Sequence, residues 1–375
     1  MAGLPSLRRA HGRSTRRTGL AAALALVIAT ALVSALALAG PVVPAGTASQ
    51  PAPAGTLSSQ PAPFETLRVM VVGDSVSQGF GGDAPWRYWF WREFRRQGVP
   101  IDLVGPHRQP TGKGARYESR RLSFDRDHAA RAGSTVDYHR KRIDGLMARY
   151  TPHVVVVELG INDAIHGDSA AQVADDLRSL LERIWAASPQ TRVVLAELPV
   201  YPRDRAVDRV AAAANTRLDA RYGDDPRVLM VRNRTDRRHR WDPVKVTFDG
   251  LHLNSTGQTL LAQRIAEAFR RGGMLPAAPR IYHARPWRPG VVPRVHRKGR
   301  RVTIDWSAAV GPVKMASVQV VIRRSNGRLV RGHQRFAADT GSVTRRLPRG
   351  TYRVLLSPRR GTMTGKPVPV TFRVP

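Results

Sequence analysis

The sequence predicts a three-layer α/β/α domain built on a doubly wound parallel sheet, followed by a small all-β sandwich. Between residues 67 and 273, short apolar runs alternate with amphipathic helical patterns. Strands that are apolar on both faces are typical of a parallel sheet covered by helices. After residue 280 the helical patterns stop and short strand-like runs recur about every ten residues, which is typical of a sandwich.

Five apolar runs are the expected strands of the parallel sheet: residues 67–72, 101–105, 153–160, 192–199 and 227–231. The main helical patterns cover residues 86–98, 135–150, 169–188, 204–223 and 255–273. Ser255 is the expected N-cap of the last helix. In the sandwich, the expected strands include the runs "RVTIDW", "SVQVVIRR", "GRLVRGHQRF", "GTYRVLLS" and "VPVTFRV".

Composition divides the chain into five expected segments: a signal peptide or signal anchor at 1–39, a Pro/Ala/Ser-rich linker at 40–64, the α/β domain at 65–275, a second linker at 276–290 and the sandwich at 291–375. Five arginines in the first 18 residues precede a continuously apolar run at 19–40. That run fits an export signal, and it is also long enough to span a bilayer as an anchor. We therefore expect a secreted or cell-surface protein. The chain has no cysteine, so it folds without disulfides.

The charge is strongly basic and unevenly distributed. Lys and Arg number 61 against 28 Asp and Glu, a formal net charge of +33, and residues 276–375 hold 22 basic and two acidic residues. Such a segment predicts contact with an anionic cell-wall polymer or a membrane surface. A solubilising surface explains the same charge equally well. Nucleic acid is not expected as a partner, because it does not fit the export signal.

Polar residues directly after the expected strands are the candidates for a site, because open α/β sheets bind ligands at the carboxyl ends of their strands. Ser75 lies in "GDS", Gly133 ends a long loop, Asn162 lies in "GIND", and Asp249 and His252 lie in "DGLHLN". Asp249 can orient His252, which then takes a proton from Ser75. The N–H groups of Ser75 and Gly133 and the side-chain amide of Asn162 can stabilise the oxyanion that forms. Each motif alone also has a structural interpretation, for example a helix cap for Ser75. Their joint order favours the catalytic interpretation.

These motifs resemble those of the SGNH/GDSL-type hydrolases over about residues 66–272. The resemblance implies a flavodoxin-like α/β/α fold, with the four namesake residues at Ser75, Gly133, Asn162 and His252. It also implies an esterase that needs no metal or organic cofactor. The segments "IDLVGP" and "FDRDHAARAG" are similar to those of secreted acetyl-xylan-esterase-like enzymes. An acylated carbohydrate or another small ester is then the expected substrate, and an O-acyltransferase with the same triad is the alternative.

The C-terminal segment resembles a fibronectin-type-III or immunoglobulin-like sandwich. Trp306 would be a core tryptophan, and Tyr352 would form a contact similar to a tyrosine corner. A second interpretation of the whole protein follows from this segment, namely a surface protein that mainly binds anionic cell-wall polymer through residues 276–375.

Overall fold

The computed structural model describes residues 65–112, 115–118, 122–234, 241–286, 288–309 and 314–375. The predicted export signal and the first linker therefore lie outside the described residues. Within these ranges, no helix is both long enough and apolar enough to cross a membrane.

A five-stranded parallel sheet forms the centre of the first domain. Its strands are β1 (Leu67–Gly73), β2 (Ile101–Val104), β3 (Val154–Glu158), β4 (Arg192–Ala196) and β5 (Val228–Val231). They are arranged in the order β2-β1-β3-β4-β5, and every neighbouring pair is parallel. The predicted fold class is thus confirmed.

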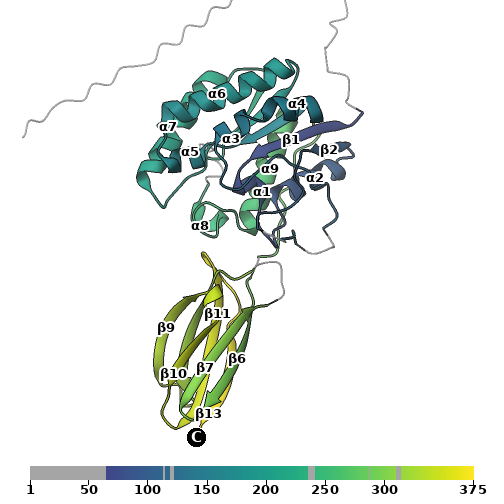
Figure 1. Ribbon diagram of the computed structural model, residues 1–375. Helices are drawn as coiled ribbons and strands as arrows, with labels where there is room; N and C mark the ends of the chain where they lie inside the picture. The colour runs from purple at the N-terminus through teal and green to yellow at the C-terminus, as the bar shows by residue number, and fades with distance from the viewer. Residues whose placement is uncertain (1–64, 113–114, 119–121, 235–240, 287, 310–313) are drawn as a thin grey trace, which may run out of the picture. The chain divides into compact units, whose positions relative to one another are not determined.

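Helices cover both faces of this sheet (Figure 1). The helices α2 (Trp86–Arg96) and α9 (Ser255–Arg271) pack together on one face, and α4 (Ile143–Tyr150), α6 (Ala170–Ala187) and α7 (Arg205–Tyr222) form the other layer. Phe90 and Phe269 join α2 to α9 with ring centroids 5.0 Å apart, and both side chains are fully buried. The aromatic-rich run "WRYWFW" therefore contributes to the core.

The sheet changes direction at β1, which lies between β2 and β3. In doubly wound sheets, the crevice at the carboxyl ends of the strands on either side of such a point binds ligands. The last residues of β1 and β3, Gly73 and Glu158, are partners in the parallel register. The residues that follow these two strands, among them Ser75 and Asn162, consequently emerge next to each other.

Two helix predictions need correction. The pattern at 135–150 forms two helices, α3 (Val136–Arg140) and α4, because the N–H of Arg142 bonds the carbonyl of His139 three residues back and tightens the turn. The N-cap of α9 is Asn254, whose side chain accepts the N–H groups of Thr256 and Gly257. The predicted cap, Ser255, is the first helical residue.

The C-terminal part contains two antiparallel sheets. One has the order β10-β7-β6, and in the other β11 pairs with β8, β12 and β13 while β9 pairs with β8. The strands are β6 (Val291–Lys298), β7 (Arg301–Ala308), β8 (Ser317–Arg324), β9 (Leu329–Ala337), β10 (Ser342–Arg346), β11 (Gly350–Arg360), β12 (Met363–Thr364) and β13 (Val368–Val374), with a short 3₁₀ turn η1 (Ala338–Thr340). Side chains from both sheets share one apolar core.

Three of these strands, β6, β10 and β12, were not predicted. β6 lies within the predicted sandwich but contains Pro293, which argues against a strand except at the edge of a sheet, where β6 in fact lies. Trp306 is buried as expected, and the Tyr352 hydroxyl donates to the carbonyl of Pro348 at 2.7 Å.

We expect Gly257→Ala to destabilise the protein. A Cβ at Gly257 would lie 2.0 Å from the carbonyl oxygen of Val246, which also accepts the N–H of Asn254 at 3.0 Å. The backbone must shift, and this cost outweighs the gain of about 1 kcal/mol in helix propensity. Thermal unfolding should therefore begin at a lower temperature than in the wild type.

Gly145→Ala in α4 is the matched control, because an added Cβ there meets no atom within 4 Å. Its propensity gain should raise the unfolding temperature slightly. Equal stability of the Gly257→Ala variant and the wild type would contradict the expectation.

Candidate active site

The turn after β1 presents the hydroxyl of Ser75. Ser75 begins the short helix α1 (Ser75–Gln78), and the cap of this helix is Asp74, whose Oδ1 accepts the N–H of Val76 at 2.8 Å. The Ser75 hydroxyl is therefore not used for capping. It lies 2.9 Å from Nε2 of His252 instead, although the two residues are 177 positions apart in the chain.

A continuous hydrogen-bond chain runs from Ser75 through His252 to Asp249. The Asp249 Oδ2 lies 2.7 Å from Nδ1 of His252, and Oδ1 accepts the backbone N–H groups of His252 and Leu251 at 2.8 and 3.1 Å. With Nδ1 donating to Asp249, Nε2 is left to accept the Ser75 proton. The structure thus brings the three predicted triad residues together in the order that proton transfer requires.

The hydrogen-bond partners of Asp249 stabilise the ionised form of its carboxyl. Burial alone would raise the pKa of its carboxyl. The hydrogen bond and charge of His252 and the two backbone N–H groups have a larger, opposite effect, so the pKa falls from 3.8 to about 2. Asp249 therefore stays ionised and favours the positive charge that His252 gains when it accepts a proton.

Two aromatic rings flank the histidine. Phe80 meets the His252 ring edge-on with centroids 4.8 Å apart, and Phe248 stacks on it at 5.8 Å. The backbone closes the same loop, since the N–H of Phe248 donates to the carbonyl of His252 at 2.9 Å. This packing limits the imidazole to a small range of orientations.

The amide of Asn162 lies at the start of α5 (Ile161–His166), directly after β3. Its Nδ2 donates to Oδ2 of Asp74 at 3.2 Å and to the carbonyl of Ser134 at 3.0 Å. Both amide hydrogens are therefore in use, so one of them must change partner before it can donate to an oxyanion. Asp74 is thus a direct neighbour of this predicted donor.

Gly133 lies in the loop that reaches the end of β1. Its φ of +75° is in the left-handed region that favours glycine, and an added Cβ would meet no atom within 4 Å. Backbone conformation rather than lack of space therefore explains the glycine. The adjacent residue, Ser134, receives the Asn162 amide, which places this loop beside the other predicted oxyanion donors.

A buried serine and histidine support this loop and were not predicted. The Ser134 hydroxyl lies 2.8 Å from Nε2 of His139 in α3 and 2.7 Å from the carbonyl of Arg131. Burial lowers the pKa of His139 to about 4, so its ring is neutral. The N–H of Arg131 in turn donates to the carbonyl of Gly73 at 2.9 Å. The only sequence signal was the position of Ser134 directly after Gly133.

Two buried acids, Asp74 and Glu158, lie beside the turn that carries Ser75. Burial raises the pKa of Asp74 to about 6, and it raises that of Glu158 well above the ordinary range. Glu158 accepts the hydroxyl of Ser77 at 2.8 Å. The run "VVVVE" predicted a buried strand and no role for Glu158. The one sequence signal for Glu158 was a charged residue at the end of an otherwise apolar strand.

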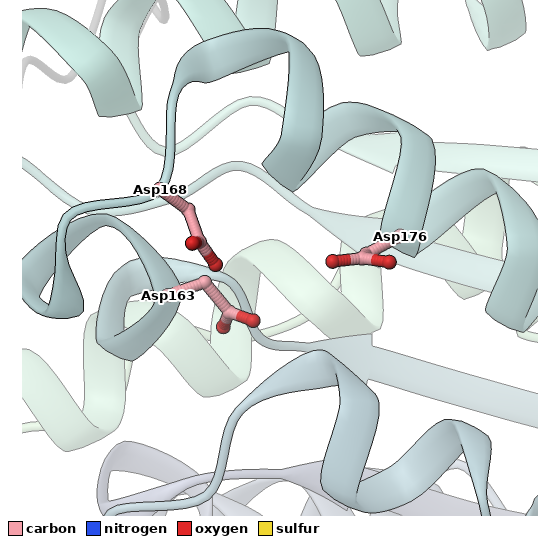
Figure 2. A group of neighbouring side chains, drawn as sticks. All are labelled: Asp163, Asp168 and Asp176. Carbon is pink, nitrogen blue, oxygen red and sulfur yellow. The ribbon is translucent and has the colours of Figure 1, made fainter.

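Three aspartates, Asp163, Asp168 and Asp176, form the group of described residues that could hold a metal ion (Figure 2). The carboxylate of Asp163 already accepts the N–H of Val136 at 3.0 and 3.2 Å, so it caps α3. Capping accounts for the position of Asp163 without a metal ion.

The chain matches the GDSL-like Lipase/Acylhydrolase family over residues 71–260, just over half of its 375 residues. The chain therefore belongs to this family. The match confirms the predicted class, a serine hydrolase acting on ester bonds.

Known proteins resemble parts of the chain. Thioesterase 1/protease 1/lysophospholipase L1 of Escherichia coli K12 is 26% identical over 143 residues, which is 38% of this chain and 66%, just under two thirds, of that protein. A family 3 carbohydrate esterase from Clostridium thermocellum is 24% identical, covering 55% of this chain and 94% of that one with a TM-score of 0.44. A family 3 carbohydrate esterase from Talaromyces cellulolyticus is 22% identical, covering 55% and 97% with a TM-score of 0.46.

The raised pKa of Asp163 makes stability depend on pH. Burial raises this pKa from 3.8 to about 6, with the Val136 N–H opposing and the neighbouring aspartates adding to the shift. Between these values the folded protein holds a proton that the unfolded chain has released. Stability from this group is therefore complete below about pH 3.8 and is lost as the pH rises to about 6.

We expect Asp163→Asn, which keeps an oxygen acceptor for Val136, to reduce the fall in unfolding temperature between pH 4 and 6. Asp175→Asn, at an exposed position of α6, is the control and should leave that profile unchanged. Identical profiles for Asp163→Asn and the wild type would contradict the assignment.

Proposed function

We propose that this protein is an exported esterase that hydrolyses short-chain acyl esters, in particular acetyl esters on a carbohydrate. The observation that carries the proposal is the hydrogen-bond chain Ser75–His252–Asp249 at the carboxyl edge of the sheet. Export is supported by the basic and apolar N-terminal sequence. The carbohydrate substrate is supported by the resemblance of "IDLVGP" and "FDRDHAARAG" to secreted carbohydrate esterases.

In the proposed mechanism, Nε2 of His252 takes the proton of Ser75 Oγ as that oxygen attacks the ester carbonyl. The Asp249 carboxylate stabilises the resulting imidazolium. His252 then protonates the leaving alkoxide, and water releases the acyl group from Ser75 by the same proton transfers in reverse.

The oxyanion that forms at each step is held by the N–H groups of Ser75 and Gly133 and by the Asn162 amide. Ser75 is the first helical residue of α1, and the first N–H groups of a helix have no partner within it. Asn162 exchanges its bond to Asp74 or to Ser134 for the oxyanion. The amide is therefore held close to its working position before substrate arrives.

Ser75→Ala is expected to lower kcat on 4-nitrophenyl acetate by on the order of 10⁶-fold, because the variant lacks the nucleophile. Ser188→Ala at the end of α6 is the control, since no hydrogen bond of the Ser188 hydroxyl is found among the described residues. Wild-type activity in Ser75→Ala would exclude this nucleophile. In the wild type, 4-nitrophenyl palmitate and a lysophospholipid should be poorer substrates than the acetate, and the reverse order would contradict the short-chain specificity.

An acyltransferase would form the same acyl-enzyme and pass the acyl group to a sugar hydroxyl. Product analysis with an added acceptor sugar separates the two reactions, because hydrolysis gives free acid and transfer gives the acylated acceptor.

A row of like charges favours a second role for the C-terminal domain, which we propose to be fibronectin-type-III-like. In the sheet β10-β7-β6, Arg301 lies in register with Arg346 on one side and with Lys298 on the other. All three side chains are exposed, and none pairs with a carboxylate among the described residues. Like charges directly opposite each other repel, and a polyanion laid across the strands would relieve that repulsion. The row therefore supports binding of an anionic cell-wall polymer.

The double variant Arg301→Gln/Arg346→Gln of the full chain should elute from beads carrying teichoic acid at a lower salt concentration than the wild type. Arg335→Gln removes one exposed charge from β9, where its register partner is the neutral Gln319, and should elute close to the wild type. Equal elution of the double variant and the wild type would exclude this surface.

A further inference from the structure

Two arginines meet on one tyrosine ring beside the loop that carries Gly133. The guanidinium of Arg131 lies 4.9 Å from the ring centroid of Tyr138 and donates to its hydroxyl at 2.9 Å. The guanidinium of Arg142 lies 3.9 Å from the same centroid and donates to the Tyr138 carbonyl at 2.8 Å. The ring therefore holds two positive groups in defined positions at the surface.

Neither guanidinium has a carboxylate partner among the described residues. The basic side chains between them in sequence differ, because Arg140 and Lys141 both pair with Asp137. The charges of Arg131 and Arg142 are thus left uncompensated, whereas Asp137 neutralises Arg140 and Lys141. Two fixed, uncompensated guanidiniums are suited to bind an anion by charge-assisted hydrogen bonds.

The backbone of Arg131 connects this pair to the candidate active site. Arg131 precedes Gly133 by two residues, a span of at most about 7 Å. Its N–H donates to the carbonyl of Gly73, which is two residues before Ser75. Burial is the main cause of the lowered pKa of His139, a hydrogen bond to Gly73 opposes it, and the charges of Arg142, His107 and Arg131 lower it as well. The pair is therefore joined through the Arg131 backbone to the strand end that leads to Ser75.

We propose that Arg131 and Arg142 form a subsite for an anionic group on the alcohol portion of the ester. This inference rests on the proposed esterase function and narrows its substrate class to acylated sugars that carry a carboxylate or a phosphate. Arg131 forms the inner wall of the subsite, Arg142 the outer wall, and Tyr138 keeps both in place. Because guanidinium planes match the geometry of carboxylate and phosphate oxygens, the pair binds either anion with two or more hydrogen bonds.

The test compares kcat/KM of the full-length protein on matched substrates. Acetylated methyl glucuronoside is paired with the acetylated glucuronamide, which lacks the charge, and acetylated glucose 6-phosphate is paired with acetylated glucose. We expect the anionic member of at least one pair to be preferred about tenfold, and added salt to reduce that preference. The pair that shows the preference identifies the carboxylate or the phosphate.

Arg131→Gln should lower the anionic-to-neutral ratio of kcat/KM about tenfold, mainly through KM, and Arg142→Gln should act in the same direction. Arg140→Gln removes a charge that Asp137 already compensates, and it should leave the ratio unchanged. An equal effect of Arg140→Gln would show that net charge alone matters and would overturn the subsite. Should Arg131→Gln fail to fold, the wild-type preference and its salt dependence still decide the question.

A wild type that hydrolyses the neutral esters without preference for either anion overturns the inference and leaves the proposed function intact. A wild type that hydrolyses none of the esters overturns both.

Discussion

The parallel pairing of β1 with β3 is the constraint on which the site depends. Their last residues, Gly73 and Glu158, lie in register, so the segments that follow emerge side by side. Gly73 has no side chain because a Cβ there would lie 2.6 Å from Ser77 and 3.1 Å from the carbonyl of Glu158. The carbonyl of Gly73 also accepts the N–H of Arg131, which fixes the loop that carries Gly133 to the same strand end. The paired ends of β1 and β3 thus position the predicted nucleophile Ser75, the loop that carries Gly133 and the amide of Asn162.

Two ionisable side chains next to these groups, Asp74 and Glu158, are buried. Asp74 is fully buried, and its raised pKa shows that the surroundings favour its neutral form. The same carboxyl caps α1 and accepts a hydrogen bond from the Asn162 amide. A single residue therefore connects the turn that carries Ser75 to the predicted oxyanion donor. An apolar residue at this position would bury at less cost, but it would leave the N–H of Val76 without this acceptor and the Asn162 amide with the Ser134 carbonyl alone.

Most of the α/β domain could be predicted because its strands are apolar on both faces and its helices have clear periodicity. The prediction was wrong where distant contacts override local pattern. The run 135–150 has continuous helical spacing, yet a tight turn at Arg142 divides it, and the buried partners Asp163 and Ser134 hold α3 at Val136 and His139. In the sandwich, the strand that holds Pro293 was missed, because proline is tolerated only at the edge of a sheet and the sequence does not show which strand lies at an edge.

By itself, the sequence determined which residues follow each strand end, and hence the candidates Ser75, Asn162 and His252, because strand and turn patterns depend on neighbours in the chain. Only the tertiary structure decided that Ser75 and His252 lie 2.9 Å apart and that Asp74 rather than Ser75 caps α1. It also decided that two arginines share the ring of Tyr138. The physical reason is that contacts between side chains depend on strand order, register and packing, which spacing along the chain does not encode.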